Sequence, residues 1–268
     1  MSTSKPHIVF LHGGWHSPIY FSKVTSLLQD HLYVVHAEQL PATGLPPSWT
    51  PPSDLSLDIA ATRTLLDYAI ADGNDVVVIC HSWGGTIAGS ALVGYSKEDR
   101  AEKGLKGGVV KCGYMAAFMV DDGVSLQGKV GEYPPWYNVD VRLVSFFPDE
   151  GLLDVTQDPY VNPNDPDIFY NDLPKDEQAY WFSQLKTHSL ATLQSPTTGA
   201  SWKTIPSSYL FCEQDRALPP SVQEILIDEA KEKGASIDVV RIDAGHSPFL
   251  SKPKETVDWI RGVAGEKV

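Results

Sequence analysis

An uninterrupted apolar run, VVVIC at residues 76–80, constrains the fold of this chain more than any other feature. It is rich in β-branched residues, it follows the turn sequence Gly73-Asn74-Asp75, and residues 82–95 after it form a stretch of small residues with helical character. A strand that is apolar on both faces is typical of a parallel sheet whose two faces are covered. The run therefore predicts a buried strand at the centre of an α/β protein.

Short apolar runs alternate with helix-like stretches along most of the chain, without repeats or low-complexity tracts. Hydrophobic periodicity predicts strands over residues 7–11, 32–36, 76–80, 109–118, 208–212 and 237–242. It predicts helices over residues 18–29, 54–71, 82–95, 221–233 and 253–262, the second with Leu57, Leu65 and Tyr68 toward the core. Such alternation indicates a doubly wound, mainly parallel sheet of about six strands.

One long segment departs from this pattern. Residues 120–204 are rich in aromatic residues and proline, and about 80 residues are too many for one connection inside a compact domain. Their aromatic content disfavours a disordered loop. We expect a core built from residues 1–119 and 205–268, with residues 120–204 forming a small cap that contains a helix over residues 173–186. The length of 268 residues fits one large domain or two small ones.

Charge and cysteine content exclude several classes of function. Lys and Arg number 21 and Asp and Glu 34, a formal net charge of −13 that disfavours nucleic acids and anionic membrane surfaces as partners. The three cysteines are distant from one another and lie in apolar runs, which favours buried thiols over disulfides or a metal site. Neither a signal peptide nor a membrane span is expected. We expect a cytoplasmic protein with a small-molecule substrate; the oligomeric state stays open.

The strongest chemical motif is the sequence CHSWGG at residues 80–85. A serine between a strand and a helix, with small residues two positions before and after it, is typical of a nucleophile elbow. Ser82 would occupy a strained turn that presents its hydroxyl above the sheet, where the crowded backbones leave space only for small neighbours. Gly84 meets this requirement, whereas Cys80 stands where glycine is commonest. We predict that Ser82 is the nucleophile.

A glycine turn follows the first strand in the sequence HGGWH at residues 12–16. Acyl transfer requires two N–H donors for the developing oxyanion. We predict that the Gly14 and Trp83 N–H groups form this oxyanion hole.

An acid and a histidine follow the last two predicted strands. A hydroxyl nucleophile needs a base, and the base needs a carboxylate that orients it. Asp215 lies just past the strand at 208–212, and His246 lies past the strand at 237–242. The order Ser82, Asp215, His246 along the chain is that of a known hydrolase triad. Asp121 or Asp122, after the preceding strand, is the alternative orienting acid.

The remaining histidines and nearby aromatic residues have less specific signals. His12 and His16 flank the glycine turn and are expected to brace it by hydrogen bonds. His188, in the predicted cap, could reach the pocket or lie at the surface. We include Trp15, His16 and His188 as candidate substrate-binding residues, with Trp15 and Trp83 as walls of an apolar pocket. No metal ligands are predicted.

Taken together, these motifs resemble those of the α/β-hydrolase superfamily over nearly the whole chain. The start of the first strand close to His12 resembles the short branch of plant methylesterases and hydroxynitrile lyases and their fungal and bacterial relatives. The sequence FYND at residues 169–172 resembles the same branch. Hydroxynitrile lyases of this type carry lysine after the catalytic histidine and threonine at the position of Gly13, whereas Ser247 follows His246 here.

The resemblance implies a serine esterase or lactonase that acts without metal or organic cofactor on a small, fairly apolar substrate through an acyl-enzyme. Two alternatives stay open: a lyase or cyclase-type biosynthetic enzyme that uses the same pocket, and a non-catalytic ligand-binding homologue.

Overall fold

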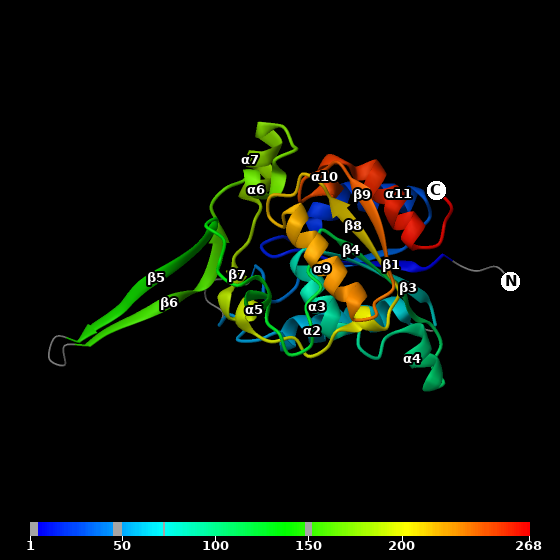
Figure 1. Ribbon diagram of the computed structural model, residues 1–268, viewed down its shortest axis with the longest axis horizontal. Coiled ribbons are helices and arrows are strands. Elements are labelled where there is room, and N and C mark those ends of the chain that lie inside the picture. The colour runs from blue at the N-terminus through cyan, green and yellow to red at the C-terminus, as the bar shows by residue number, and fades with distance from the viewer. Residues whose placement is uncertain (1–4, 45–49, 72, 148–151) are drawn as a thin grey trace.

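A six-stranded parallel sheet forms the centre of the computed structural model, which describes residues 5–44, 50–71, 73–147 and 152–268 (Figure 1). Residues 1–4, on which the expectation of no signal peptide partly rests, lie outside the described residues. The strand order is β2-β1-β3-β4-β8-β9. The strands are β1 (His7–Leu11), β2 (Val35–Ala37), β3 (Asp75–His81), β4 (Gly108–Met115), β8 (Ser207–Cys212) and β9 (Ile237–Ile242). The predicted doubly wound α/β fold is confirmed.

Helices cover both faces of this sheet, as Figure 1 shows. Alternate residues of β1 contribute to two different apolar clusters, since Ile8 and Phe10 belong to one and Val9 and Leu11 to the other. The first cluster includes side chains of α1 (Ser22–Asp30) and α11 (Pro253–Val263), and the second includes side chains of α9 (Pro220–Glu232). The helices α2 (Ser56–Ile70) and α3 (Trp83–Ala91) contribute side chains to both clusters. Burial on both faces explains why the strands β1 and β3 are nearly continuous apolar runs.

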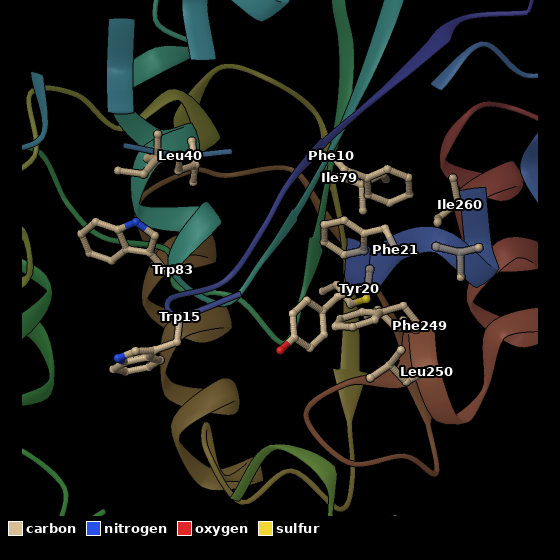
Figure 2. Close-up of a cluster of buried hydrophobic side chains, with 14 of the residues drawn as sticks. Phe10, Trp15, Tyr20, Phe21, Leu40, Ile79, Trp83, Phe249, Leu250 and Ile260 are labelled. Atoms are coloured by element: carbon tan, nitrogen blue, oxygen red, sulfur yellow. The ribbon is translucent and has the colours of Figure 1, made fainter. Parts of the chain in front are cut away.

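The first cluster is held together largely by aromatic rings (Figure 2). The ring centroids of Phe10 and Phe21 lie 4.5 Å apart, and those of Phe21 and Phe249 lie 4.9 Å apart. These contacts connect β1 to the helical segments that precede α1 and α11. The same cluster extends to Trp15 and Trp83, so the core is continuous with the loops above the sheet.

Several element boundaries differ from the expected ones. The helix expected at residues 18–29 is a 3-10 turn, η1 (Pro18–Phe21), followed by α1. Leu32 has a φ of 63° in the turn after α1, so β2 begins only at Val35. The helix after Ser82 ends at Ala91, and β4 ends at Met115, where Ala116 turns to a φ of 42°.

Residues 120–204, which lie between β4 and β8 and are called the insertion below, form additional structure outside the six-stranded sheet. It contains the predicted helix as α7 (Lys175–Ser183) and a three-stranded antiparallel sheet that the sequence did not predict. Its other elements are α5 (Leu126–Val130), β5 (Tyr137–Phe147), β6 (Leu152–Pro163), α6 (Asp167–Tyr170), β7 (His188–Ser189), α8 (Leu190–Gln194) and η2 (Ser201–Lys203). The β5–β6 hairpin projects away from the rest of the molecule (Figure 1).

Two short helices complete the fold, α4 (Lys97–Glu102) before β4 and α10 (Pro248–Ser251) before α11. Within the described ranges, none of the helices has the length and apolar character that crossing a bilayer requires.

Candidate active site

Ser82 lies at the sharp junction between β3 and α3. It has a φ of 50° and a ψ of −117°, a conformation that costs a non-glycine residue about 1–3 kcal/mol. Backbone hydrogen bonds hold the turn from both sides, because Ser82 N–H donates to the Met115 carbonyl at 3.3 Å and Phe118 N–H donates to the Ser82 carbonyl at 3.2 Å. The predicted strained turn is therefore present, and the start of a nine-residue helix lies directly behind it.

The small residues around Ser82 are required by backbone contacts. A Cβ atom on Gly84 would lie 2.5 Å from the Leu11 carbonyl oxygen, and one on Gly85 would lie 2.2 Å from the Phe118 carbonyl oxygen. Cys80 is tolerated because its side chain is fully buried in the second apolar cluster, with Sγ 3.4 Å from the Gly113 carbonyl. The departure from glycine at position 80 thus leaves the turn intact.

Asp215 and His246 form a buried hydrogen-bonded pair. The Nδ1–H of His246 donates to Asp215 Oδ2 at 2.8 Å, and both side chains are at most 1% exposed. The other carboxylate oxygen, Oδ1, accepts the N–H groups of Ala217 and Leu218, each at 2.8 Å. Since a carboxylate only accepts hydrogen bonds, this arrangement places the proton on Nδ1 and leaves Nε2 unprotonated in the neutral ring.

The alternative acids lie elsewhere. Asp121 accepts a hydrogen bond from Lys233 Nζ at 2.7 Å and also faces Lys129 and Lys203, which lower the pKa of its carboxyl. Asp122 is exposed. The structure thus brings Asp215, and neither of these residues, to His246.

The glycine turn after β1 is braced by its two histidines. The Nδ1–H of His12 donates to the Gly13 carbonyl at 2.8 Å, while its Nε2 accepts the Leu40 N–H at 2.9 Å. The Nδ1–H of His16 donates to the Gly14 carbonyl at 2.7 Å. Burial lowers the pKa of His12 to about 4 and that of His16 to about 3, so both rings are neutral at pH 7. Because the Gly13 carbonyl and the Gly14 N–H share one planar trans peptide unit, holding the carbonyl fixes the direction of the N–H.

His81, next to Ser82, contacts both the backbone and the ring of His246. Its Nε2–H donates to the His246 carbonyl at 2.9 Å, and the two ring centroids lie 4.6 Å apart. Burial lowers the pKa of His81 well below its ordinary range. A Cβ atom on Gly13 would lie 2.8 Å from His81 Nδ1 and 3.1 Å from Ser82 Cβ, so this site has no room for the threonine of the lyases.

A cavity of about 430 Å³ opens beside Ser82 and His246, both of which line it. Its walls are mostly apolar and come from the first glycine loop, the loop after β4, the insertion and α9. They include Trp15, Phe118, Leu126, Val130, Pro134, Trp136, Tyr137, Phe169, Leu218, Val222 and Leu226. Periodicity predicted the helix that supplies Val222 and Leu226, but gave no sign that its side chains face the site.

Of the three candidate substrate-binding residues, only Trp15 lines this cavity. Both ring nitrogens of His16 are hydrogen-bonded within the protein: Nδ1–H donates to the Gly14 carbonyl, and Nε2 accepts a hydrogen bond from the Tyr170 hydroxyl at 3.1 Å. His188 is neither at the surface nor in the cavity wall: it is fully buried between the hydroxyls of Thr43 and Thr192, at 3.1 and 3.2 Å. Burial lowers its pKa to about 3. Its ring packs against that of the lining residue Trp15, 5.5 Å between centroids, and edge-on against that of Trp83 at 4.9 Å. Trp83, which was expected to form a wall of the pocket, does not line the cavity.

The arrangement of possible metal ligands across the fold also bears on the chemistry of the site. Over the described ranges, no group of three or more His, Cys, Asp or Glu side chains is arranged to hold a metal ion. The three cysteines are buried free thiols, as expected.

Comparisons with known proteins agree with this fold. A family model described as "Alpha/beta hydrolase family" matches residues 8–259. "Alpha/beta hydrolase nvfD" of Aspergillus novofumigatus is 32% identical, over 98% of each chain. "Norfluorocurarine synthase 2" of Strychnos nux-vomica is 25% identical, over 100% of this chain and 98% of its own. The crystal structure of polyneuridine aldehyde esterase superposes with a TM-score of 0.72 at 19% identity, over 97% of this chain and 100% of its own.

Proposed function

Because this chain belongs to the α/β-hydrolase family, we propose that it is a serine hydrolase that cleaves a small, fairly apolar carboxylic ester or lactone through an acyl-enzyme. The observation that carries this proposal is the buried Asp215–His246 hydrogen bond of 2.8 Å beside a cavity that Ser82 also lines. A base oriented by a carboxylate, next to a serine on a strained turn, is what activation of a hydroxyl requires.

In the proposed reaction, His246 Nε2 takes the Ser82 proton as Oγ attacks the carbonyl carbon. The Gly14 and Trp83 N–H groups stabilise the oxyanion of the tetrahedral intermediate. The intermediate collapses, the C–O bond to the leaving group breaks, and His246 returns the proton to the departing alcohol. His246 then deprotonates a water molecule that attacks the acyl-enzyme. The bond between the acyl carbon and Ser82 Oγ breaks, His246 returns the proton to Oγ, and the carboxylic acid leaves. These steps draw on no metal or organic cofactor.

We also propose that residues 120–204 act as a cap over this site. The support is that Leu126, Trp136, Tyr137 and Phe169, all from this segment, line the same cavity as Ser82. Apolar and aromatic walls favour a largely apolar substrate whose scissile carbonyl is its main polar group.

The decisive experiment replaces Ser82 with alanine and measures turnover of p-nitrophenyl esters, aryl methyl esters and lactones. We expect kcat/KM to fall by at least about 1000-fold while folding is unchanged, since removal of a nucleophile has effects of this size or larger. Ser22→Ala, at an exposed position in α1, is the matched control and should keep wild-type rates. Ester turnover that survives in Ser82→Ala would refute the proposed nucleophile.

A lyase or cyclase-type reaction is the second candidate, because a relative that aligns over this whole chain is named a synthase. Labelling with a fluorophosphonate probe and mass mapping to Ser82 would establish a reactive serine. Formation of a product without net addition of water, undiminished in Ser82→Ala, would favour the second candidate. Tight retention of a ligand without turnover would instead favour a binding protein.

A further inference from the structure

Four consecutive residues of the insertion, at positions 169–172, contact three of the four segments that carry the proposed catalytic groups, namely those of Gly14, Asp215 and His246. Phe169 lines the cavity, and its ring centroid lies 5.6 Å from that of His246. The Tyr170 hydroxyl donates to His16 Nε2 at 3.1 Å, and His16 in turn holds the Gly14 carbonyl. The first two residues of this segment therefore contact the base and support the glycine turn.

The next two residues hold the loops of the acid and the base. Asn171 Nδ2–H donates to the Gln214 carbonyl at 2.9 Å, one residue before Asp215. Asp172 Oδ2 accepts the Gly245 N–H at 2.7 Å, one residue before His246. Adjacent side chains thus hold two loops that are about 30 residues apart in the chain, and each hydrogen bond is made next to a proposed catalytic residue.

The packing at Gly245 shows how closely these side chains approach the base loop. A Cβ atom at Gly245 would lie 2.4 Å from Asn171 Oδ1 and 2.8 Å from Asp172 Oδ1. Both of these oxygens are buried, and neither has a hydrogen-bond partner within the residues that the structure describes. Burying polar atoms without partners costs free energy. Packing and the two hydrogen bonds to the Gln214 carbonyl and the Gly245 N–H must therefore offset this cost.

We propose that Asn171 and Asp172 are positioning residues, which fix the Asp215 and His246 loops so that the base keeps its orientation toward Ser82. The two loops also contact each other directly, since Gln214 N–H donates to the Ala244 carbonyl at 2.9 Å. Asn171 and Asp172 hold this pair of loops from the insertion side. In this way the segment that lines the cavity also aligns the residues beneath it.

The test compares Asp172→Ala, Asp172→Asn and Asn171→Ala with the matched control Asp176→Ala, an exposed position in α7. Asp172→Ala removes the acceptor and leaves the buried Gly245 N–H without a partner, so the His246 loop relaxes. Misplacement of a reacting group by about 1 Å can cost about 100-fold in rate. We expect kcat to fall about 10- to 100-fold in Asp172→Ala, with KM changed by less than about threefold.

The conservative variant separates positioning from a general loss of stability. Asp172→Asn keeps an oxygen that accepts the Gly245 N–H, so we expect kcat within about fivefold of wild type. Asn171→Ala loses a more exposed hydrogen bond, and we expect a smaller fall than in Asp172→Ala. Unchanged kcat in both alanine variants would overturn the proposal. An Asp172→Asn variant as impaired as Asp172→Ala would also overturn it, because retaining an oxygen that accepts the Gly245 N–H would then give no benefit.

The kinetic test rests on the proposed function, because it needs a substrate that the enzyme turns over. A spectroscopic measurement tests the positioning role without a substrate. The His246 Nδ1–H that donates to Asp215 should give a strongly downfield proton resonance in wild type and in Asp172→Asn. It should broaden or disappear in Asp172→Ala, at a temperature where circular dichroism shows that the variant is folded. If wild type hydrolyses none of the esters or lactones, the proposed function fails, and this resonance still decides the positioning role. A resonance identical in wild type and both alanine variants would refute it.

Discussion

At the scale of single residues, Asp58 shows how a polar side chain becomes part of the core. It lies in α2 and is 1% exposed, with Oδ1 accepting the Ala42 N–H at 2.7 Å and Oδ2 accepting the Trp83 Nε1–H at 3.3 Å. It thereby connects the loop after β2 to the residue that follows the proposed nucleophile. Burial raises the pKa of its carboxyl from the ordinary 3.8 to about 6, although both hydrogen bonds act in the opposite direction.

This pKa predicts a pH-dependent contribution to stability. Since the folded state binds the Asp58 proton more tightly than the unfolded state, the contribution is full below about pH 4 and is lost as pH rises through about 6. The free energy of unfolding of wild type should fall relative to that of Asp58→Asn by about 2 kcal/mol between about pH 4 and pH 7. Urea unfolding of both proteins at the two pH values measures this difference.

Asp54 offers a control of opposite sign. Its carboxylate accepts the Ser56 N–H at 2.8 Å, which lowers its pKa. Asp54→Asn should therefore cost stability at neutral pH and cost less as the pH falls. A difference between wild type and Asp58→Asn that does not change with pH would contradict the raised pKa.

The residue scale is also where sequence periodicity was least informative. Leu57 and Tyr68 were expected to face the core, but they are 52% and 73% exposed, whereas Asp58 in the same helix is buried. A prediction from hydrophobic periodicity treats Asp58 as polar and therefore expects it on the exposed face of the helix. It cannot represent hydrogen bonds to Ala42 and Trp83, which come from loops and helices elsewhere in the chain. Ser82, Asp215 and His246 could be proposed from the sequence because they lie one, three and four residues past the ends of β3, β8 and β9.

At the scale of elements, α3 approaches β1 so closely that glycine is required between them. The Cβ position at Gly84 lies 2.5 Å from the Leu11 carbonyl oxygen and 2.9 Å from its carbon. Backbone atoms in a buried strand cannot move aside as a flexible side chain could. This contact sets the position of the helix whose first residue follows Ser82.

Replacing Gly84 with alanine should therefore separate the two elements. We expect the free energy of unfolding to fall by about 1–3 kcal/mol, as for other overpacking substitutions in a core. Gly262→Ala in α11 is the matched control, because that position has open space around it and alanine favours helix by up to about 1 kcal/mol. Thermal unfolding of the two variants should shift in opposite directions. A Gly84→Ala variant as stable as wild type would contradict the close packing of α3 on β1.

The elements of the core were predicted far better than those of the insertion. The strands β1, β3 and β8 are β-rich runs that are buried along nearly their whole length, and helices such as α1 and α11 have an apolar stripe, so the strand and helix periods could be distinguished. The β5–β6 hairpin was not predicted, although α7, which follows it along the chain, was. Proline and aromatic residues dominate residues 120–204, and the three-stranded sheet there depends on pairing of β6 with β7, such as Val161 with His188, across 27 positions.

At the scale of the whole molecule, the parallel sheet explains why Asp215 pairs with His246 and why His246 lines the same cavity as Ser82. Ser82, Asp215 and His246 follow β3, β8 and β9, whose carboxyl ends all lie at one edge of the sheet. Their positions after these strands were therefore enough to predict that all three lie at this edge. The cavity was not predictable in the same way, because its walls come from the first loop, the insertion and α9, and their side chains meet only in three dimensions.

The charge of the whole molecule leads to the last prediction. The net charge is −13, and the cations at the cavity are paired with acids, Lys129 with Glu229 and Arg216 with Asp167. At about 0.15 M salt such pairs leave little positive potential to attract phosphate groups. We expect no binding to duplex DNA by fluorescence anisotropy, and no co-sedimentation with phosphatidylserine vesicles, under conditions in which a basic control protein binds both. Binding that weakens steeply with added salt would reveal a cationic surface, and would contradict a small neutral molecule as the sole kind of partner.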